Sequence, residues 1–492
     1  MTELKFSATS TKLPEIPSEE KQIVILGVRK SENQYELVSN FPEATQETSL
    51  VSDLLTQVEL LGADTSLNSV TKLAAKDFTQ TVFYLVGLGT DEELENLRQA
   101  SGAAIRAARG EQNVVITLPN STTAELEAIA EGALLGAYDF TKFRSEAKAE
   151  TAQIEIRSDL PEAADVLSRA AVLVAAVNTV RDLTNLPANH LNPELFAALA
   201  EKEAEAHGVT YREYKGTELV AEKLSGLLAV GAGSATPPRL VRLEWNPAEA
   251  KTHIALVGKG ITFDTGGYSL KPASSITEMK TDMCGAATVF QTVLAAAQLG
   301  LPVKVTGWLC LAENMVSGTA SRPDDVITYR NGKSVEINNT DAEGRLVMAD
   351  GLIMASEEKP DVVIDIATLT GAQMVALGER VTGIMGDDAV RDDLIAAATA
   401  TAELAWGMPL PEHLKDGLKS DIADLKNTGS RWGGMLSAGI FLSEFVADTP
   451  WAHIDIAGPS FNRHGAYGHT PKGATGVMLR TLIQYLEERI AE

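Results

Sequence analysis

The feature that most constrains this chain is the stretch Asn339-Thr-Asp-Ala-Glu-Gly-Arg-Leu346, which places two carboxylates and a guanidinium on one short turn. The alternating residues 333–337 before it predict a strand, and the apolar spacing after it predicts a helix. Open α/β sheets place their binding sites at the carboxyl ends of strands. The stretch therefore predicts an α/β fold with a candidate site at this turn. Thr340 and Glu343 also have the spacing of a capping box, which is a purely structural alternative.

A second stretch upstream repeats this arrangement. Residues 253–257 predict a buried strand that runs into a glycine-rich turn, and Asp264, Lys271 and Asp282 follow along the chain. Asp282 precedes the alanine-rich helical run 286–298, so a helix N-cap is its structural alternative. Acids at two strand ends are harder to explain as caps than any one of them alone. We therefore expect the four acids of the two stretches to meet.

Four converging carboxylates need cations, because like charges buried together would otherwise force protonation. Oxygen ligands without nearby Cys or His suit divalent ions better than they suit a structural zinc site. Asp341 and Glu343 stand two residues apart on the turn, so both can face one side. A pair of metal ions about 3.5–4 Å apart can share a water, lower its pKa and clamp a carbonyl group.

Together, the two stretches resemble the signature segments of the leucyl aminopeptidase family, the two-metal cytosolic exopeptidases, and occur in the family's order. The resemblance covers about residues 170–492 and extends less distinctly to the N-terminal part. It implies a metal-dependent aminopeptidase that hydrolyses N-terminal residues, preferably leucine and other apolar ones, from peptides with a metal-bridging hydroxide. It also implies two divalent ions per subunit (Mn²⁺ or Zn²⁺), a bicarbonate ion and a homohexamer.

The resemblance further implies a role for each motif residue. The metal ligands would be Lys259, Asp264, Asp282, Asp341 and Glu343, with Asp264 and Glu343 bridging. Lys271 would polarise the scissile carbonyl, and Arg345 would hold the bicarbonate that shuttles a proton. The residues alone leave alternatives open, namely a salt bridge from Lys259 to one of the acids and an ion pair between Arg345 and Asp341 or Glu343.

The same resemblance implies a side-chain pocket for the substrate, lined by Met279, Thr368, Leu369, Gly371 and Ala457. This lining favours unbranched or γ-branched apolar residues such as leucine and methionine. Ser460 follows where some relatives carry a larger apolar residue, which leaves a strict leucine preference open.

The rest of the chain predicts two domains joined by a helix. Residues 1–160 alternate strands with helices and predict an N-terminal α/β domain, for which the resemblance implies a role in assembly. Residues 161–184 predict a connecting helix, and residues 185–492 the catalytic domain, with a central mixed, largely parallel sheet flanked by helices. Residues 1–20 are polar and predicted to be loosely held.

The charge, the cysteines and the apolar stretches of the chain limit which partners and which cellular compartment we expect. The net charge of −25 over 492 residues argues against a nucleic-acid partner. Cys284 and Cys310 are too few for a disulfide framework and predict buried thiols. The N-terminus lacks the apolar core of a signal peptide, and no stretch approaches the roughly 20 apolar residues of a membrane span, so we expect a cytoplasmic protein without a membrane partner.

Two alternatives belong to other functional classes. One is another two-metal hydrolase, such as an amidase or a phosphoesterase, and the other is a non-catalytic binding protein on the same scaffold. Phosphoesterase sites usually include His, and none of the seven His residues lies in the motifs. A binding protein would have broken ligand positions, whereas every expected ligand is present.

Overall fold

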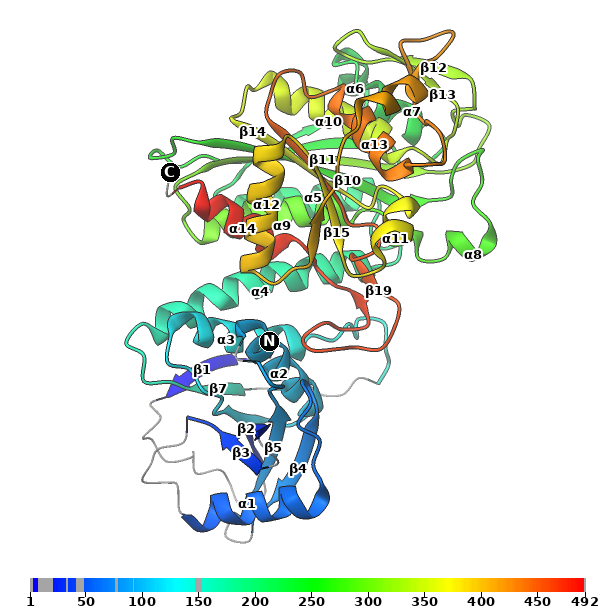
Figure 1. Cartoon of the computed structure of the whole chain (residues 1–492). Coiled ribbons are helices and arrows are strands. Elements are labelled where there is room, and N and C mark those ends of the chain that lie inside the picture. The colour runs from blue at the N-terminus through cyan, green and yellow to red at the C-terminus, as the bar shows by residue number, and fades with distance from the viewer. Residues whose placement is uncertain are drawn as a thin grey trace. The chain divides into compact units, whose positions relative to one another are not determined.

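The computed structural model describes residues 3–7, 21–31, 34–40, 48–75, 78–91, 93–146 and 153–490. The chain divides into two compact units (Figure 1). Unit 1 comprises Met1–Asn178 and Arg463–Lys472, and unit 2 comprises Thr179–Asn462 and Gly473–Glu492. The return of residues 463–472 to unit 1 had no signal in the sequence.

Unit 1 is an α/β unit whose sheet, over the described residues, has seven strands. Five of them pair in parallel in the order β1-β7-β6-β2-β5. The other two pair antiparallel, β3 with β2 and β4 with β5. Alternate residues of β2 enter two separate cores, one on each face of the sheet. The elements are β1 (Glu3–Ser7), β2 (Gln22–Ser31), β3 (Gln34–Val38), α1 (Thr48–Leu61), β4 (Val70–Ala74), β5 (Thr81–Gly87), α2 (Leu94–Ala107), β6 (Asn113–Ile116), α3 (Thr123–Ala137) and β7 (Gln153–Arg157).

The first residues of the chain differ from the expectation of a loosely held segment. Residues 3–7 form β1, which pairs in parallel with β7 along its whole length. The alternation of Leu4 and Phe6 was too short a signal to predict a strand. Residues 8–20 of the same predicted segment lie outside the described residues.

Helix α4 (Ala163–Asn185) continues from unit 1 into unit 2. It is long and apolar enough, by length and composition alone, to cross a membrane, which corrects the expectation that no stretch approaches that length. Core helices pass the same test, and α4 places Ala163, Leu167 and Ala170 in a core of unit 1.

Unit 2 contains an eight-stranded sheet within the described residues, in the order β16-β15-β18-β14-β10-β11-β9-β8. The central strands β18, β14, β10 and β11 are parallel, while β15 and β9 join them antiparallel. The predicted mixed, largely parallel sheet is therefore confirmed. Helices α9 and α14 lie on one side of it, and α10 and α13 on the other (Figure 1).

The remaining elements of unit 2 follow in chain order. They are α5 (Pro193–Ala206), β8 (Thr210–Tyr214), α6 (Thr217–Ala221), α7 (Ser225–Gly231), β9 (Arg239–Trp245), β10 (His253–Asp264), α8 (Ala273–Ile276), η1 (Met279–Thr281), α9 (Cys284–Gln298), β11 (Lys304–Asn314), β12 (Asp325–Thr328), β13 (Ser334–Ile337), α10 (Gly344–Glu357), β14 (Val362–Ala367), α11 (Gly371–Leu377), β15 (Thr382–Gly386), α12 (Asp388–Ala400), β16 (Ala405–Gly407), η2 (Glu412–Leu418), β17 (Leu425–Lys426), α13 (Gly434–Ser443), β18 (Trp451–Asp455), β19 (Phe461–Asn462), β20 (Gly473–Ala474) and α14 (Leu479–Glu488).

Strand β10 is longer than predicted, because it continues through the glycines that suggested a turn and ends at Asp264. A Cβ on Gly258 would lie 2.6 Å from the Cα of Ala286, so this glycine lets α9 pack directly on the strand. Lys259 is therefore a strand residue, paired in register with Cys310 of β11. Cys310 and Cys284 are both buried, as predicted.

Candidate active site

Three segments of unit 2 bring the predicted acids together. Asp264 ends β10, Asp282 lies between η1 and α9, and Asp341 and Glu343 lie on the turn between β13 and α10. Carboxylate oxygens of Asp264, Asp341 and Glu343 all lie within 4.8 Å of one another. The small sheet that contains β13 is separate from the central sheet, so this turn comes from a side sheet rather than from a central strand end.

Lys259 lies between two of the carboxylates. Its Nζ is 2.7 Å from Oδ2 of Asp282 and 2.9 Å from Oε1 of Glu343, and it donates to the carbonyl of Thr368 at 3.1 Å. Burial alone would lower the pKa of Lys259, but the carboxylates outweigh it and raise this pKa. These are the contacts of the salt-bridge alternative. A ligand role would need the neutral amine.

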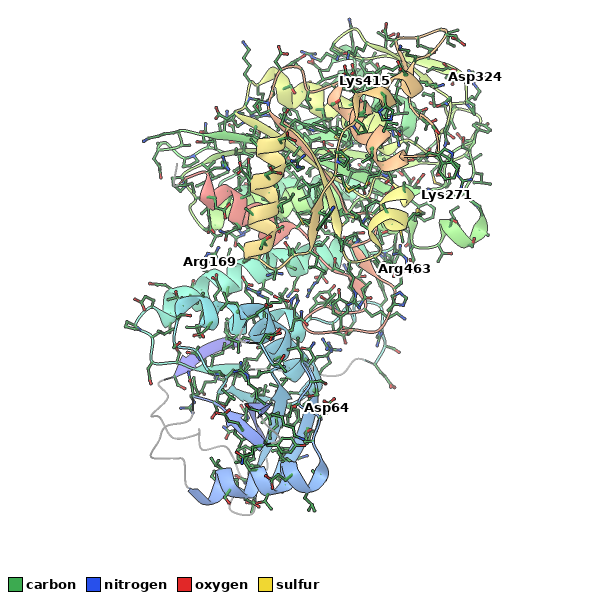
Figure 2. The ribbon with its side chains drawn as sticks, in the orientation of Figure 1. Asp64, Arg169, Lys271, Asp324, Lys415 and Arg463 are labelled. Carbon is green, nitrogen blue, oxygen red and sulfur yellow. The ribbon has the colours of Figure 1, made fainter. Side chains whose placement is uncertain are left out.

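Lys271 bridges the other two carboxylates. It lies on the segment between β10 and α8 (Figure 2), and its Nζ is 2.8 Å from Oδ2 of Asp264 and 2.6 Å from Oδ1 of Asp341. The side chain of Lys271 is 14% exposed and that of Asp264 is 2% exposed, so their ion pair is shielded from water, whereas Asp341 is 32% exposed and its pair with Lys271 is partly open to water. Burial opposes its charge, but the acids raise the pKa of Lys271. Lys271 is therefore an ammonium at the edge of the acidic cluster.

The pKa values of three of the acids are raised and that of the fourth is lowered, as expected for crowded carboxylates next to lysines. Burial and the charge of Glu343 raise the pKa of Asp264 to about 6, against the two lysines. Burial also raises the pKa of Asp282 well above its usual range, and that of Asp341 above it. Burial would raise the pKa of Glu343 as well, but Lys259 and Lys271 outweigh it and lower this pKa. The cluster thus concentrates more negative charge than its lysines neutralise.

Neither structural alternative for the acids is realised. Helix α10 has Glu343 at its N-cap position without a side-chain cap bond, and α9 has Met283 there, also without one. The hydroxyl of Thr340 instead donates to the carbonyl of Gly266 at 2.6 Å and accepts from the amide of Ser269 at 2.7 Å. Thr340 therefore ties the two motif segments together instead of capping the helix.

Arg345 points into the same buried region from the first turn of α10. Its Nη1 donates to the carbonyl of Asn427 at 2.8 Å, while Nε is buried with no hydrogen-bond partner among the described residues. Burial lowers the pKa of Arg345 to about 10, although Glu343 and Asp455 oppose this shift, so the group remains charged at neutral pH. In the described part of the chain Glu343 and Asp341 pair with the lysines rather than with Arg345.

Sequence reasoning missed two asparagines that hold the acids. Nδ2 of Asn314 donates to Oδ1 of Asp264 at 2.8 Å and to the carbonyl of Thr340 at 3.0 Å. Asn314 ends β11 in register with Asp264, and a polar residue at a buried strand end was the available signal. Asn427 contacts the turn that carries Asp341 and gave no such signal, because it follows the two-residue strand β17 in a segment that reads as an ordinary glycine-rich loop.

Four of the predicted pocket residues lie at two neighbouring strand ends. Thr368, Leu369 and Gly371 follow β14, and Ala457 follows β18, its parallel neighbour. The buried carboxylate of Asp455 accepts from the amides of Leu369 and Ala457 at 3.2 and 3.1 Å, which joins the two segments. Thr368 also donates to Asp282 at 2.8 Å, so these segments adjoin the acids.

The fifth predicted pocket residue, Met279, lies in η1 and is half-buried. On the chain it lies between Lys271 and Asp282. Ser460, in contrast, is 1% exposed.

The donor set fits a pair of divalent cations. With all four carboxyl groups ionised, as cations would hold them, two ammonium groups leave two negative charges, and three of the acids are almost fully buried. Oε2 of Glu343 is buried and has no hydrogen-bond partner within the described ranges, so it offers an unused lone pair. Hard or intermediate divalent ions accept such oxygen ligands.

Comparison with known proteins finds two family models that match the chain. The model of the catalytic domain of the cytosol aminopeptidase family matches residues 178–483, and the model of that family's N-terminal domain matches residues 23–147. The chain belongs to the cytosol aminopeptidase family. This membership confirms the resemblance to the leucyl aminopeptidases and supports a metal-dependent aminopeptidase that acts on peptides.

Individual cytosol aminopeptidases match over most of their length. A probable cytosol aminopeptidase of Micrococcus luteus is 56% identical over 82% of this chain and 83% of its own. One of Corynebacterium glutamicum is 45% identical over 94% of each chain. A solved structure of the bottromycin maturation enzyme BotP in complex with Mn has a TM-score of 0.84 and 34% identity, and covers 96% of this chain and 99% of that one.

Proposed function

We propose that this cytosol aminopeptidase removes N-terminal leucine and other apolar residues from peptides, with two divalent ions, Mn²⁺ or Zn²⁺, in the acidic cluster. The observation that carries the proposal is the convergence of four carboxylates and two lysines from three segments into one buried site. A solved relative that holds Mn supports the choice of metal.

The ions would be held by Lys259, Asp264, Asp282, Asp341 and Glu343, with Asp264 and Glu343 as the bridging ligands. Glu343 is close to all the other acids, since it shares Lys259 with Asp282 and lies within 4.8 Å of Asp264 and Asp341. When bound, two such ions would lower the pKa of water, so that a hydroxide is available for attack at neutral pH, and would polarise the scissile carbonyl. Lys259 would have to bind as the neutral amine; its burial favours that form, while the carboxylates, which now raise its pKa, would oppose it less once cations neutralise them.

Lys271 would act on the scissile carbonyl as an electrophile. Its ammonium now pairs with Asp264 and Asp341, and it becomes available once those carboxylates turn to cations. A donor aimed at the developing oxyanion stabilises the transition state more than the ground state. The mostly buried position of Lys271 strengthens this effect, because less water screens the charge.

Arg345 would hold a bicarbonate ion that carries a proton between water and the leaving group. Its Nε is buried and has no hydrogen-bond partner in the described part of the chain, so it is a donor that an anion would satisfy. Nη1 is already fixed on Asn427, so the orientation of the guanidinium is set before an anion binds.

The substrate's side chain would enter the pocket of Met279, Thr368, Leu369, Gly371 and Ala457. A Cβ added to Gly371 would meet no atom of the described residues within 4 Å, so space is open there for an apolar side chain. A free α-amine is the terminus that such a site selects, because an acetylated amine cannot coordinate a cation.

The test is hydrolysis of leucine amide and of N-acetyl-leucine amide by chelator-stripped protein, before and after addition of Mn²⁺ or Zn²⁺. We expect metal-restored cleavage of leucine amide alone. Failure to cleave with either ion would overturn the aminopeptidase proposal. Cleavage of the acetylated substrate as well would instead favour another two-metal amide hydrolase.

Assembly and compartment complete the proposal. A homohexamer is expected from the family resemblance, and the names of the relatives support a cytoplasmic location. Sedimentation of the purified chain tests the first, since a monomer at micromolar concentration would contradict it.

A further inference from the structure

Asn427 lies in the loop after β17, and its side chain is completely buried. We propose that Asn427 is a positioning residue that holds the turn of Asp341, Glu343 and Arg345 in the geometry that binds metal. The inference rests on the proposed function, because it concerns the same site. It adds a residue that is itself neither a ligand nor a group that touches substrate.

The side-chain amide of Asn427 makes four hydrogen bonds, all to the backbone of this turn. Its Oδ1 accepts from the backbone amides of Asn338 and Asn339 at 3.0 and 3.3 Å. Its Nδ2 donates to the carbonyls of Asn339 and Ala342 at 2.7 and 3.3 Å. An amide side chain has two donor hydrogens and an acceptor with two lone pairs, and all are engaged here.

The backbone of Asn427 also makes hydrogen bonds, to the segments before and after the turn. Its amide donates to the carbonyl of Glu336 in β13 at 3.0 Å. Its carbonyl accepts from Nη1 of Arg345 in α10 at 2.8 Å. One residue, more than 80 positions away in sequence, therefore fixes the strand before the turn, the turn itself and the arginine after it.

Part of the turn's support is its own, since Oδ1 of Asn339 accepts from the amide of Asp341 at 2.9 Å, and the rest comes from outside. Helix α10 has no side-chain cap of its own, and Thr340 is occupied by Gly266 and Ser269 of the other motif. Asp341 and Glu343 lie on either side of Ala342, whose carbonyl Asn427 holds. Groups that orient metal ligands from outside the coordination sphere typically change metal affinity 10- to 100-fold when removed.

A buried asparagine could also serve stability alone, and the chain offers a matched control for that. Asn120 in unit 1 is 6% exposed, and its Nδ2 donates to the carbonyls of Leu118 and Arg157 at 3.0 and 2.8 Å. It joins two strand ends of unit 1 much as Asn427 joins its loop to the turn. The site carboxylates all belong to unit 2.

The test compares chelator-stripped wild type, Asn427→Ala and Asn120→Ala by Mn²⁺ titration, with free Mn²⁺ followed by electron paramagnetic resonance, and by thermal unfolding. We expect Asn427→Ala to weaken Mn²⁺ binding 10- to 100-fold. We expect Asn120→Ala to lower the melting temperature while its Mn²⁺ affinity stays within about twofold of wild type, outside the range of such outer-shell effects. Unchanged Mn²⁺ affinity of folded Asn427→Ala would overturn the inference.

If Asn427→Ala does not fold, Asn427→Asp replaces it, because this variant keeps the shape and the acceptor oxygen but loses both donors. The added negative charge would by itself attract Mn²⁺, so a loss of roughly threefold or more in affinity would point to a displaced turn. Equal or tighter binding would overturn the inference.

The wild type separates this inference from the proposed function. If wild type binds Mn²⁺ and cleaves leucine amide while the Asn427 variants bind Mn²⁺ normally, only the positioning role fails. If wild type does not bind Mn²⁺ or cleave, the proposed function fails and the positioning role with it.

Discussion

At the start of α10, Gly344 leaves room for the side chain of Lys259. A Cβ at this position would stand 2.5 Å from Cε and 2.7 Å from Nζ of the lysine. We predict that Gly344→Ala displaces Lys259 and lowers both Mn²⁺ affinity and kcat/KM for leucine amide more than about tenfold. The melting temperature should change little, because alanine is favoured over glycine in a helix by about 1 kcal/mol, which offsets part of the cost of moving the lysine.

Gly318→Ala is the control for Gly344→Ala, since a Cβ at Gly318 would meet no atom within 4 Å among the residues that the structure describes. It should leave Mn²⁺ affinity and kcat/KM unchanged. Wild-type Mn²⁺ affinity in Gly344→Ala would mean that the lysine can move aside without cost, and would weaken the case for Lys259 as a ligand.

Lys271 invites a prediction that separates chemistry from metal binding. Loss of one donor to an oxyanion typically costs about 10²- to 10³-fold in kcat, so we predict a loss of that size in Lys271→Ala. Mn²⁺ should bind at least as tightly as in wild type, because the variant removes a positive charge that now pairs with Asp264 and Asp341.

Steady-state kinetics and the Mn²⁺ titration together test Lys271→Ala. The control is Lys72→Ala in unit 1, where the ammonium lies 4.4 Å from the centroid of the Tyr84 ring. A wild-type kcat in Lys271→Ala would contradict the electrophile role, whereas weaker Mn²⁺ binding would show that Lys271 organises the acids instead.

At the scale of elements, identical sequence patterns had different outcomes. Thr122 and Glu125 form a capping box at the start of α3, with both reciprocal hydrogen bonds present. Thr340 and Glu343 have the same spacing, yet Thr340 contacts the other motif and Glu343 pairs with Lys259. A pattern of local spacing cannot distinguish these cases, because distant segments compete for the same side chains.

The strands show the same limit of sequence reasoning. Buried parallel strands and the helices between them could be predicted from apolar runs, and with them the meeting of acids at strand ends. The extension of β10 through Gly258 could not, because glycine is read as a turn unless the helix that packs against it is known. The contacts of Asn314 and Asn427 with the segments that carry the acids could not be predicted, because they span 26 to 89 positions.

The strands β14 and β18 carry a buried ion pair that makes stability depend on pH. Asp365 and His453 are register partners, and Nδ1 of His453 lies 2.5 Å from Oδ1 of Asp365. Burial alone would lower the pKa of His453, but Asp365 and Asp455 outweigh it and raise this pKa. A raised folded pKa stabilises the protein fully below the unfolded value, about 6.5, and the contribution is lost as pH rises through the folded value.

We therefore predict that the difference in melting temperature between wild type and His453→Asn is largest below about pH 6 and shrinks as pH rises above 6.5. Thermal unfolding of metal-free protein across this range is the measurement. His413→Asn serves as control, since His413 is exposed in η2 and its replacement should give no such trend. A difference that grows with pH would mean that His453 is neutral in the folded protein.

At the scale of the whole molecule, the two units should respond differently to metal. All five proposed ligands belong to unit 2, whereas unit 1 contains its own sheet with a core on each face. A ligand that binds only the folded state adds about 2.7 kcal/mol of stability at 100 times its Kd. We predict that Mn²⁺ slows amide hydrogen exchange in β10, α9 and α10 of unit 2 but not in β2, β5 and α2 of unit 1.

Hydrogen exchange followed by mass spectrometry, with and without Mn²⁺ at that excess, measures both units in one sample. Domains with separate cores can open independently, and only the one that loses the metal on opening gains protection. Equal gains in β2 and β5 would mean that the units open in one cooperative transition, so that metal held by unit 2 also stabilises unit 1. Slower exchange in unit 1 alone would place the metal outside the acidic cluster and contradict the proposed site.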